Sequence, residues 1–208
     1  MSDESESSSS FSRRGFLKGL GLGTMATGVA AAVKPVAQAA SGPTSIRGPG
    51  EFLVTLKING KSRTLDVEPR VTLLDALRNR LDLTGAKKVC DRGTCGACTV
   101  LVEGQPVYSC SMLAIEAEGK SITTVEGLGT QWEMSPVQKG FVKHDAQQCG
   151  FCTPGFVVAC TAFLKKNPKA TREEITGGLG GNLCRCGTYS GILDVVYEAT
   201  KGKGGAHA

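Results

Sequence analysis

Eight of the nine cysteines in this 208-residue chain fall into two groups of four. The first tetrad has the spacing C-x4-C-x2-C-x11-C and consists of Cys90, Cys95, Cys98 and Cys110. The second has the spacing C-x2-C-x31-C-x-C and consists of Cys149, Cys152, Cys184 and Cys186. Groups of four thiolates bind zinc or an iron–sulfur cluster, and cysteines can also pair as disulfides. These residues are therefore where the chain could carry out chemistry.

The spacing of the tetrads favours iron–sulfur clusters over the two alternatives. The opening C-x4-C-x2-C run is the ligand spacing of plant-type [2Fe–2S] clusters. Zinc sites usually combine two C-x2-C pairs, and here Cys95/Cys98 and Cys149/Cys152 are each completed by a differently spaced partner. Cysteines only one or two residues apart cannot easily find independent disulfide partners. We therefore predict two [2Fe–2S] clusters, with zinc and disulfides as the alternatives.

The residues around the tetrads suit a negatively charged cluster, which carries a net charge of about −2 when oxidised. Glycine leaves backbone N–H groups accessible to such an anion, and the ligand loops contain Gly93, Gly96, Gly150, Gly155 and Gly187. Four nearby cations could offset the charge: Lys87, Lys88, Arg92 and Arg185. For each cation taken alone, an ordinary solvated surface residue is the better explanation.

The ninth cysteine, Cys160, lies in a segment that we expect to form a helix over Pro154–Lys166. Thr153 would be the N-cap and Pro154 the first helical residue. Cys160 shares a helical face with apolar residues, so we expect a small buried side chain rather than a fifth ligand.

The first 50 residues differ from the rest of the chain. They contain Ser12-Arg13-Arg14-Gly15-Phe16-Leu17-Lys18, then the weakly apolar run Gly19–Val33, then Ala37-Gln38-Ala39. This order is typical of a twin-arginine export signal with a cleavage site, although a disordered basic tail is the alternative. The apolar run is shorter than the ~20 residues of a spanning helix, so we expect no membrane span after signal cleavage. Export in the folded state would deliver a cluster-loaded protein to the periplasm.

Composition excludes some other functions. A formal net charge of +5 without a dense basic run gives no reason to expect nucleic-acid binding. His144 is the only histidine within the expected domains, and no Ser/His/Asp or paired-carboxylate arrangement is evident. We therefore expect no catalytic residue and no substrate site on this chain.

Residues 51–126 have the pattern of a sheet with one helix. Asn59-Gly60 between Phe52–Ile58 and Arg63–Val67 predicts a hairpin with a type I′ turn. Thr72 is expected to begin a helix that contains Leu73, Leu74, Leu77 and Leu81. The remaining expected strands are Thr99–Val102 and Val107–Cys110, joined at Gly104-Gln105, and Ser121–Val125.

Residues 133–201 have the pattern of helices. The expected helices are Pro136–His144, Pro154–Lys166, Arg172–Gly177 and Gly191–Lys201. Thr171 and Glu174 form a capping-box pattern at the start of the third. The sequence thus predicts an α+β protein: an N-terminal β-grasp domain of the plant-type ferredoxin kind over 51–126, followed by an all-α four-helix-bundle domain over 133–201. Each domain would hold one tetrad.

Three motifs resemble those of the xanthine dehydrogenase/aldehyde oxidoreductase family of molybdenum hydroxylases. They are CDRGTCGACTV at residues 90–100, QCGFCTPG at 148–155 and GNLCRC at 181–186. The resemblance covers about 51–200 and is greatest to the exported iron–sulfur subunits of periplasmic aldehyde dehydrogenases. One departure follows Tyr189, where relatives often carry a basic residue and this chain has Ser190-Gly191.

The resemblance implies a division of labour among subunits. A large partner subunit would hold a molybdenum–molybdopterin cofactor and oxidise an aldehyde or a related substrate. The cluster of the helical domain would lie next to that cofactor, with Gln148 and Cys186 as neighbours of the pterin. The cluster of the β-grasp domain would pass electrons on to an FAD-binding subunit or a haem acceptor.

Two other functions remain open from the residues alone. A diffusible ferredoxin-like carrier without a tight enzyme partner would also use [2Fe–2S] clusters, although a simple carrier needs only one cluster domain. A zinc-stabilised interaction module is the second alternative.

Overall fold

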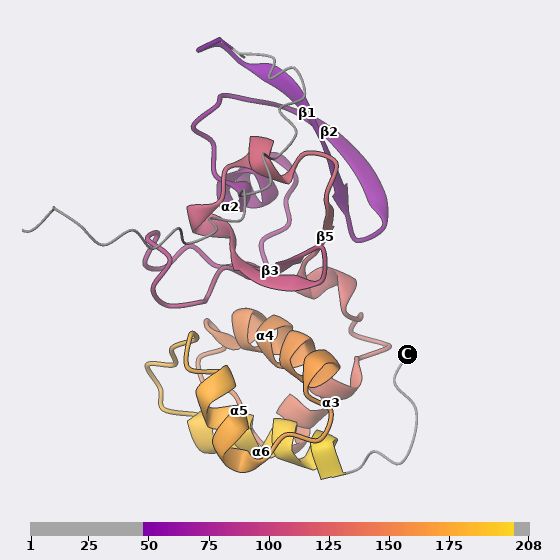
Figure 1. Ribbon diagram of the computed structural model, residues 1–208, viewed down its shortest axis with the longest axis vertical. Helices are drawn as coiled ribbons and strands as arrows, with labels where there is room; N and C mark the ends of the chain where they lie inside the picture. Colours follow the sequence, from indigo (N-terminus) through magenta and orange to yellow (C-terminus); the bar gives the residue numbers. More distant parts are fainter. Residues whose placement is uncertain (1–47, 202–208) are drawn as a thin grey trace, which may run out of the picture. The chain divides into compact units, whose positions relative to one another are not determined.

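The structure is a computed structural model that describes residues 48–201. These residues belong to one unit. The twin-arginine signal expected in the first 50 residues lies outside the described residues. Within the described part, a five-stranded mixed sheet is followed by helices, so the α+β class is confirmed (Figure 1).

The sheet contains β1 (Phe52–Ile58), β2 (Lys61–Val67), β3 (Thr99–Val102), β4 (Gln105–Tyr108) and β5 (Ser121–Thr123). The strand order is β2-β1-β5-β3-β4. The central strand β5 pairs in parallel with β1 and antiparallel with β3, while β1–β2 and β3–β4 are antiparallel hairpins. Strand β5 therefore lies between the two hairpins and pairs with one strand of each.

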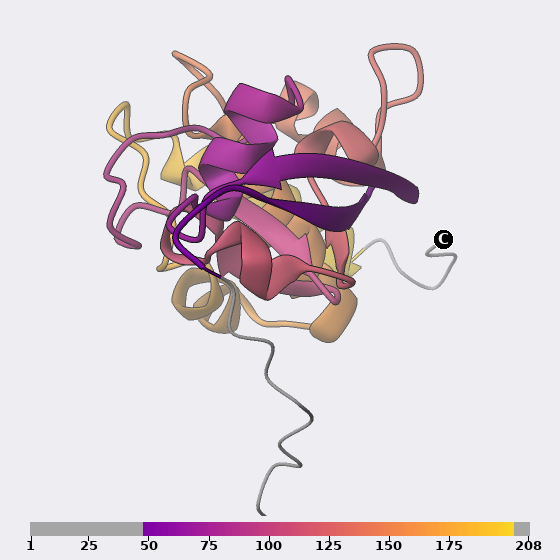
Figure 2. The same cartoon turned by 90° about the horizontal axis from the view of Figure 1, so that it is seen from above.

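The turn of the first hairpin is as predicted. Asn59 and Gly60 both have positive φ, 49° and 76°, as a type I′ turn requires. The β1–β2 register pairs Ile58 with Lys61 directly across this turn. Figure 2 shows the two strands as a long twisted ribbon.

The second hairpin turns one residue earlier than expected. Positive φ occurs at Glu103 (51°) and Gly104 (74°) rather than at Gly104-Gln105. Strand β4 runs from Gln105 to Tyr108, so the strand expected over Val107–Cys110 is wrong at both its start and its end. Cys110 lies instead in a 3₁₀ turn, η2 (Ser109–Ser111).

The helix expected after Thr72 is present, but most of it is not α-helical. The segment α2 (Leu73–Asp75) continues directly into a π-helical turn, η1 (Ala76–Arg80). The Asp75 N–H donates to Thr72 Oγ1 at 3.1 Å, which confirms the predicted start. This helical segment buries Leu73, Leu74 and Leu77 completely.

Four longer helices follow: α3 (Pro136–Lys143), α4 (Thr153–Lys166), α5 (Arg172–Gly178) and α6 (Tyr189–Lys201). The Thr171–Glu174 capping box is confirmed. Thr153, however, does not cap α4 but begins it, and the N-cap is Cys152. The Oγ1 atom of Thr153 is buried without a hydrogen-bond partner in the described structure.

Apolar side chains join the sheet to the helices within the unit. Helix α4 packs on β3, where Leu101 contacts Val158 and Ala162. Helix α6 also packs closely against the residue that caps α3, since a Cβ atom on Gly191 would lie 2.8 Å from the carbonyl oxygen of His144. This close approach gives a physical reason for glycine at position 191. No helix in residues 48–201 has the length and apolar character needed to cross a membrane.

Candidate metal centres

The first tetrad lies on the loop that precedes β3 and on the η2 turn. Cys98 and Cys110 are buried, whereas Cys90 and Cys95 are partly exposed. Backbone amides point at the sulfurs: Gly93 N–H donates to Cys110 Sγ at 3.3 Å, and Thr94 N–H donates to Cys90 Sγ at 3.4 Å. Positive φ at residues 91, 93 and 96 bends the loop so that its amides face inward.

Burial and side-chain hydrogen bonds separate these thiols into an outer pair and an inner pair. Hydrogen bonds from the amides of Arg92 and Thr94 lower the pKa of Cys90 to about 6, and the Cys95 side chain also bonds to it. Burial raises the pKa of Cys98 to about 12, and its thiol bonds to Cys110. The tetrad is thus built from an outer pair, Cys90/Cys95, and an inner pair, Cys98/Cys110.

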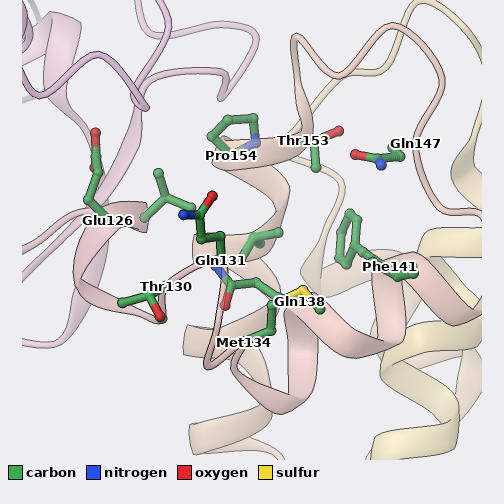
Figure 3. A pocket seen from close by; sticks show the side chains of 13 residues that line it. Glu126, Thr130, Gln131, Met134, Gln138, Phe141, Gln147, Thr153 and Pro154 are labelled. Carbon is green, nitrogen blue, oxygen red and sulfur yellow. The ribbon is translucent and has the colours of Figure 1, made fainter.

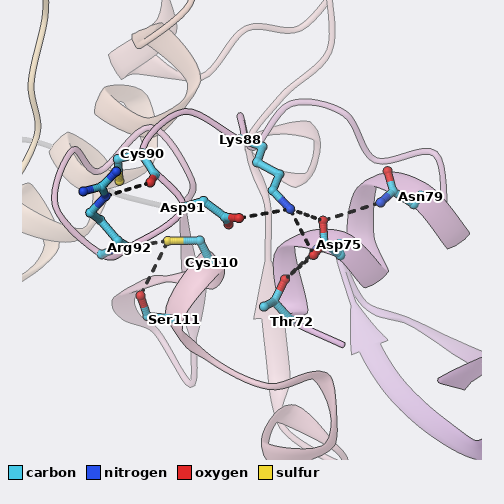
Figure 4. A network of polar contacts seen from close by, with 10 residues as sticks. Thr72, Asp75, Asn79, Lys88, Cys90, Asp91, Arg92, Cys110 and Ser111 are labelled. Carbon is cyan, nitrogen blue, oxygen red and sulfur yellow. Dashed lines mark hydrogen bonds and ion pairs between the residues drawn. The ribbon is translucent and has the colours of Figure 1, made fainter. Parts of the chain in front are cut away.

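The cations near this loop contact protein groups (Figure 4). Lys88 Nζ lies 3.0 Å from Asp75 Oδ1 and 3.1 Å from Asp91 Oδ2. Hydrogen bonds to these two carboxylates raise the pKa of Lys88. Arg92 Nε donates to the carbonyl oxygen of Cys90 at 3.2 Å. Both cations therefore hold the shape of the ligand loop as well as adding positive charge beside it.

The second tetrad is assembled from the loops that precede α4 and α6. Cys149 and Cys186 are exposed, Cys152 is partly exposed and Cys184 is buried. The side chains of Cys149 and Cys186 bond to each other, as do those of Cys152 and Cys184. This tetrad therefore repeats the outer-pair and inner-pair arrangement of the first, although its spacing in the sequence is different.

Thr188 and Tyr189 support Cys184, and neither role was predicted from the sequence. Burial acts to raise the pKa of Cys184, but hydrogen bonds from the Thr188 hydroxyl and amide outweigh it and lower the pKa to about 7. The Cys184 N–H donates to Tyr189 Oη at 2.8 Å. By contrast, burial raises the pKa of Cys152 to about 12. The only sequence signal for these supports is their position four and five residues after Cys184.

The arrangement fits a binuclear cluster. All nine cysteines lie in the described residues and are free thiols. Within residues 48–201, no three His, Cys, Asp or Glu side chains gather as a single-ion site requires. A [2Fe–2S] cluster takes two thiolates on each iron, and each tetrad presents two close thiol pairs with amides aimed at the sulfurs.

Two residues singled out earlier lie away from the inner pairs. Gln148 is exposed beside Cys149, and no hydrogen bond holds its side chain within the described structure. His144 contacts Glu198 through its ring, so a structural ion-pair partner accounts for it.

A cleft of about 430 Å³ runs between η4 (Val125–Gly127), α3 and the start of α4. Figure 3 shows Gln147, Thr153 and Phe141 among the side chains that line it. Its lining includes one carboxylate, Glu126, which accepts a 2.8 Å hydrogen bond from Gly85 N–H. The described lining contains no histidine or cysteine, so the cleft has no acid–base pair.

Comparison with known protein families gives two adjoining matches. Residues 56–124 match the model of a 2Fe-2S iron-sulfur cluster binding domain. Residues 124–197 match the model of a [2Fe-2S] binding domain. Each match contains one of the two tetrads, so the chain has two [2Fe–2S]-binding domains.

Similar proteins include iron–sulfur subunits of oxidoreductases. The chain is 44% identical over 190 residues to the aldehyde oxidoreductase iron-sulfur-binding subunit PaoA of Escherichia coli O157:H7, covering 84% of this chain and 83% of that protein. It is 47% identical over 146 residues to the nicotine 6-hydroxylase small subunit of Paenarthrobacter nicotinovorans, covering 70% of this chain and 88% of that protein.

Two solved structures extend the comparison. Quinoline 2-oxidoreductase from Pseudomonas putida 86 contains a chain that matches with a TM-score of 0.69 and 44% identity, covering 74% of this chain and 98% of that one. The aldehyde oxidoreductase from Desulfovibrio desulfuricans ATCC 27774 matches with a TM-score of 0.69 and 41% identity, covering 71% of this chain but 17% of that one. This chain belongs to the iron–sulfur subunits of the xanthine dehydrogenase/aldehyde oxidoreductase family.

Proposed function

We propose that this chain is the electron-transfer subunit of a molybdenum-dependent dehydrogenase that oxidises aldehydes or related compounds. The observation that best supports this proposal is that each tetrad consists of an outer and an inner cysteine pair, with backbone amides directed at the sulfurs. A [2Fe–2S] cluster accepts and releases one electron at a time. Electron transfer of this kind requires no substrate-binding site on this chain.

In the proposed assignment, Cys90, Cys95, Cys98 and Cys110 hold the first cluster, and Cys149, Cys152, Cys184 and Cys186 hold the second. The sheet with order β2-β1-β5-β3-β4 would be a β-grasp domain over 51–126. Helices α3 to α6 would form a four-helix bundle over 133–201. The amides of Gly93 and Thr94 would stabilise the negative charge on the first cluster.

The proposed large partner would hold the molybdopterin cofactor. The Desulfovibrio aldehyde oxidoreductase supports this, because the part like this chain makes up only 17% of a longer chain. Gln148 and Cys186 would face the pterin, since both are exposed beside the second tetrad. An FAD-binding subunit or a haem protein would receive electrons near Cys90 and Cys95, the outer pair of the first tetrad.

The proposed location is the periplasm, reached in the folded state. The support is the sequence around Arg13 and Arg14 together with the cysteines themselves. In an oxidising compartment, eight metal-free thiols would be subject to oxidation unless they had already bound metal in the cytoplasm.

The decisive experiment is metal and sulfide analysis of the purified full-length chain, combined with electron paramagnetic resonance after reduction. We expect four irons, four acid-labile sulfides and two distinct signals. One signal that integrates to a single spin, with two irons bound, would contradict the two-cluster proposal. Bound zinc without a visible cluster spectrum would favour the zinc module instead.

A second measurement separates a subunit from a diffusible carrier. Gel filtration of natively expressed protein should give a complex several times larger than the 21.6 kDa chain. Elution as a cluster-loaded monomer would favour the carrier.

A further inference from the structure

The loops that carry the two tetrads are hydrogen-bonded directly to each other. The Leu183 N–H donates to the carbonyl oxygen of Cys95 at 2.9 Å. The side-chain amide of Asn182 donates to the carbonyl oxygen of Gly96 at 2.9 Å and lies 3.3 Å from Thr99 Oγ1. Residues just before Cys184 are thus bonded to residues inside the first ligand loop.

Asn182 is unusual among these contacts because it is a buried polar side chain. It is 6% exposed, and its partner Thr99 is 2% exposed. The Thr99 hydroxyl also donates to Gly96 O at 2.6 Å. Buried amides require hydrogen-bond partners, so Asn182 is held in one orientation by these two residues.

A second contact anchors the same segment from the β4 strand. Tyr108 Oη donates to the carbonyl oxygen of Gly181 at 2.7 Å. A Cβ atom on Gly181 would lie 2.2 Å from Tyr108 Oη, so the phenol rests against the backbone there. The segment 181–183 is therefore attached to the first domain by side chains as well as by its backbone.

Glycines bring the backbones of the two loops into contact. A Cβ atom on Gly96 would lie 2.6 Å from Asn182 Cγ. A Cβ atom on Gly155, three residues after Cys152, would lie 2.4 Å from the carbonyl oxygen of Gly96. Real Cβ contacts are not this short, so any side chain at Gly155 would force the loops apart.

We propose that Asn182 is a positioning residue that fixes the separation of the two clusters and thereby the rate at which an electron passes between them. The inference rests on the proposed function. Cys184 is covalently joined to Leu183, whose amide is bonded to Cys95, so one hydrogen bond separates the two sets of ligands.

The transfer itself is a simple exchange. With both clusters bound, one electron would leave one cluster and enter the other, with no bond broken and no proton moved. Tunnelling through protein slows steeply as the gap widens, and a covalent path with one hydrogen bond is more effective than open space. We assign to Asn182 the role of maintaining the hydrogen bond between Leu183 N–H and the carbonyl oxygen of Cys95.

The test uses the full-length chain with both clusters and compares Asn182→Ala with the matched control Asn79→Ala. The Asn79 amide is exposed and lies 3.5 Å from Asp75 Oδ1, away from the second tetrad in sequence and contacts. Iron and sulfide content, the spin–spin splitting of the two reduced clusters and the rate of electron equilibration after pulsed reduction are measured in each.

We expect Asn182→Ala to keep both clusters, to show weaker splitting and to equilibrate severalfold more slowly than the wild type. Asn79→Ala should match the wild type. Full cluster content with unchanged splitting and rate in Asn182→Ala would overturn the proposal, and so would an equal loss in the control.

A second variant decides the matter if Asn182→Ala fails to hold a cluster. Gly155→Ala removes no hydrogen bond and no ligand but inserts a methyl group against Gly96. Slower equilibration in this variant would support the proposal, and an unchanged rate with both clusters bound would overturn it. A wild-type chain with fewer than two clusters would instead overturn the proposed function.

Discussion

Lys88 reaches from the first ligand loop to Asp75 at the end of helix α2, with 3.0 Å between Nζ and Oδ1. Asp91, the residue after Cys90, is the other partner of this lysine. Lys88 therefore connects the first ligand loop to the helical segment by lying between two carboxylates.

This arrangement predicts the effect of Lys88→Gln on the first cluster. The variant leaves Asp75 and Asp91 without their cation, so negative charge beside the loop increases and reduction becomes less favourable. We expect the midpoint potential to fall by less than the ~59 mV of a tenfold change in a one-electron equilibrium, because the pair is partly exposed. A redox titration followed by paramagnetic resonance measures it.

Lys120→Gln is the matched control for this titration. Lys120 is exposed, and its side chain has no partner in the described structure. Its loss should leave the potential unchanged. A potential that rises in Lys88→Gln, or that falls equally in both variants, would contradict the role assigned to Lys88.

The ninth cysteine gives a contrast between packing and ligation. Cys160 is completely buried in α4, and burial raises its pKa, which keeps the thiol protonated. Cys160→Ala should lower the stability of the protein by about 1 kcal/mol through the small cavity it leaves, and should keep both cluster signals. Cys110→Ala changes a similarly buried cysteine and should abolish the first signal. Denaturant unfolding and paramagnetic resonance report the two effects, and loss of a signal in Cys160→Ala would show that it is a ligand.

Gln148→Ala tests the proposed contact with the pterin of the large subunit. The side chain is exposed and makes no hydrogen bond within residues 48–201, so the variant should fold and hold both clusters. In the assembled complex it should lose a contact worth about 0.5–1.5 kcal/mol, with slower cluster reduction by an aldehyde or weaker retention of molybdenum. Rapid mixing followed by cluster absorbance measures the rate.

Gln147→Ala controls for the removal of an exposed amide from the same loop. Unchanged reduction kinetics and full molybdenum occupancy in Gln148→Ala would count against the contact. Loss of the second cluster in that variant would point to a structural role beside Cys149.

The pair of helices α3 and α6 should show a dependence on pH. Ion pairs with Lys143 and His144 lower the pKa of Glu198 below its ordinary value of 4.5. A carboxyl group with a lowered pKa adds stability above its ordinary pKa, and this stability is lost as the pH falls through the lowered value. Glu198→Gln should therefore reduce the melting temperature by about 1–3 °C at pH 7, and by less below pH 4.5.

Glu133→Gln serves as the control for the Glu198 measurement, since Glu133 is exposed and its carboxylate has no partner in the described structure. Melting curves followed by circular dichroism at several pH values compare the two variants with the wild type. If the loss of melting temperature in Glu198→Gln grew as the pH fell, the stabilising role of the ionised Glu198 carboxylate would be refuted.

The export signal is tested by Arg13→Lys combined with Arg14→Lys. The two arginines would be recognised as part of an export signal, and they precede both domains in the sequence. The clusters of the double variant should therefore still assemble, while the protein stays in the cytoplasm. Cell fractionation and iron analysis give the result. Normal arrival of the double variant in the periplasm would show that the twin-arginine interpretation is wrong.

Local features of the chain were determined by the sequence alone. Asn59-Gly60 specified a type I′ turn because few other residues accept two consecutive positive φ values. Thr171 and Glu174 specified a helix start because capping needs only residues three apart. The cysteine spacings indicated iron–sulfur ligands for the same reason, since most ligands of a tetrad are close neighbours along the chain.

The boundaries of turns and helices were predicted less well where the local sequence allows two neighbouring residues to take the same role. The second hairpin turns at Glu103-Gly104, where a non-glycine residue has positive φ, and Cys110 lies in a 3₁₀ turn after the end of β4. Thr153 looked like a cap but became the first residue of α4, because the backbone of Cys152 already had a helical conformation.

Tertiary structure alone decided how distant segments meet. The division of each tetrad into an outer and an inner pair depends on which thiols face each other, and residue spacing does not contain that information. The same is true of Asn182, whose buried amide finds its partners 83 and 86 residues earlier at Thr99 and Gly96. Such contacts arise only after the hydrophobic packing of α4 on β3 has brought the loops together, because their hydrogen bonds join residues with no local relationship.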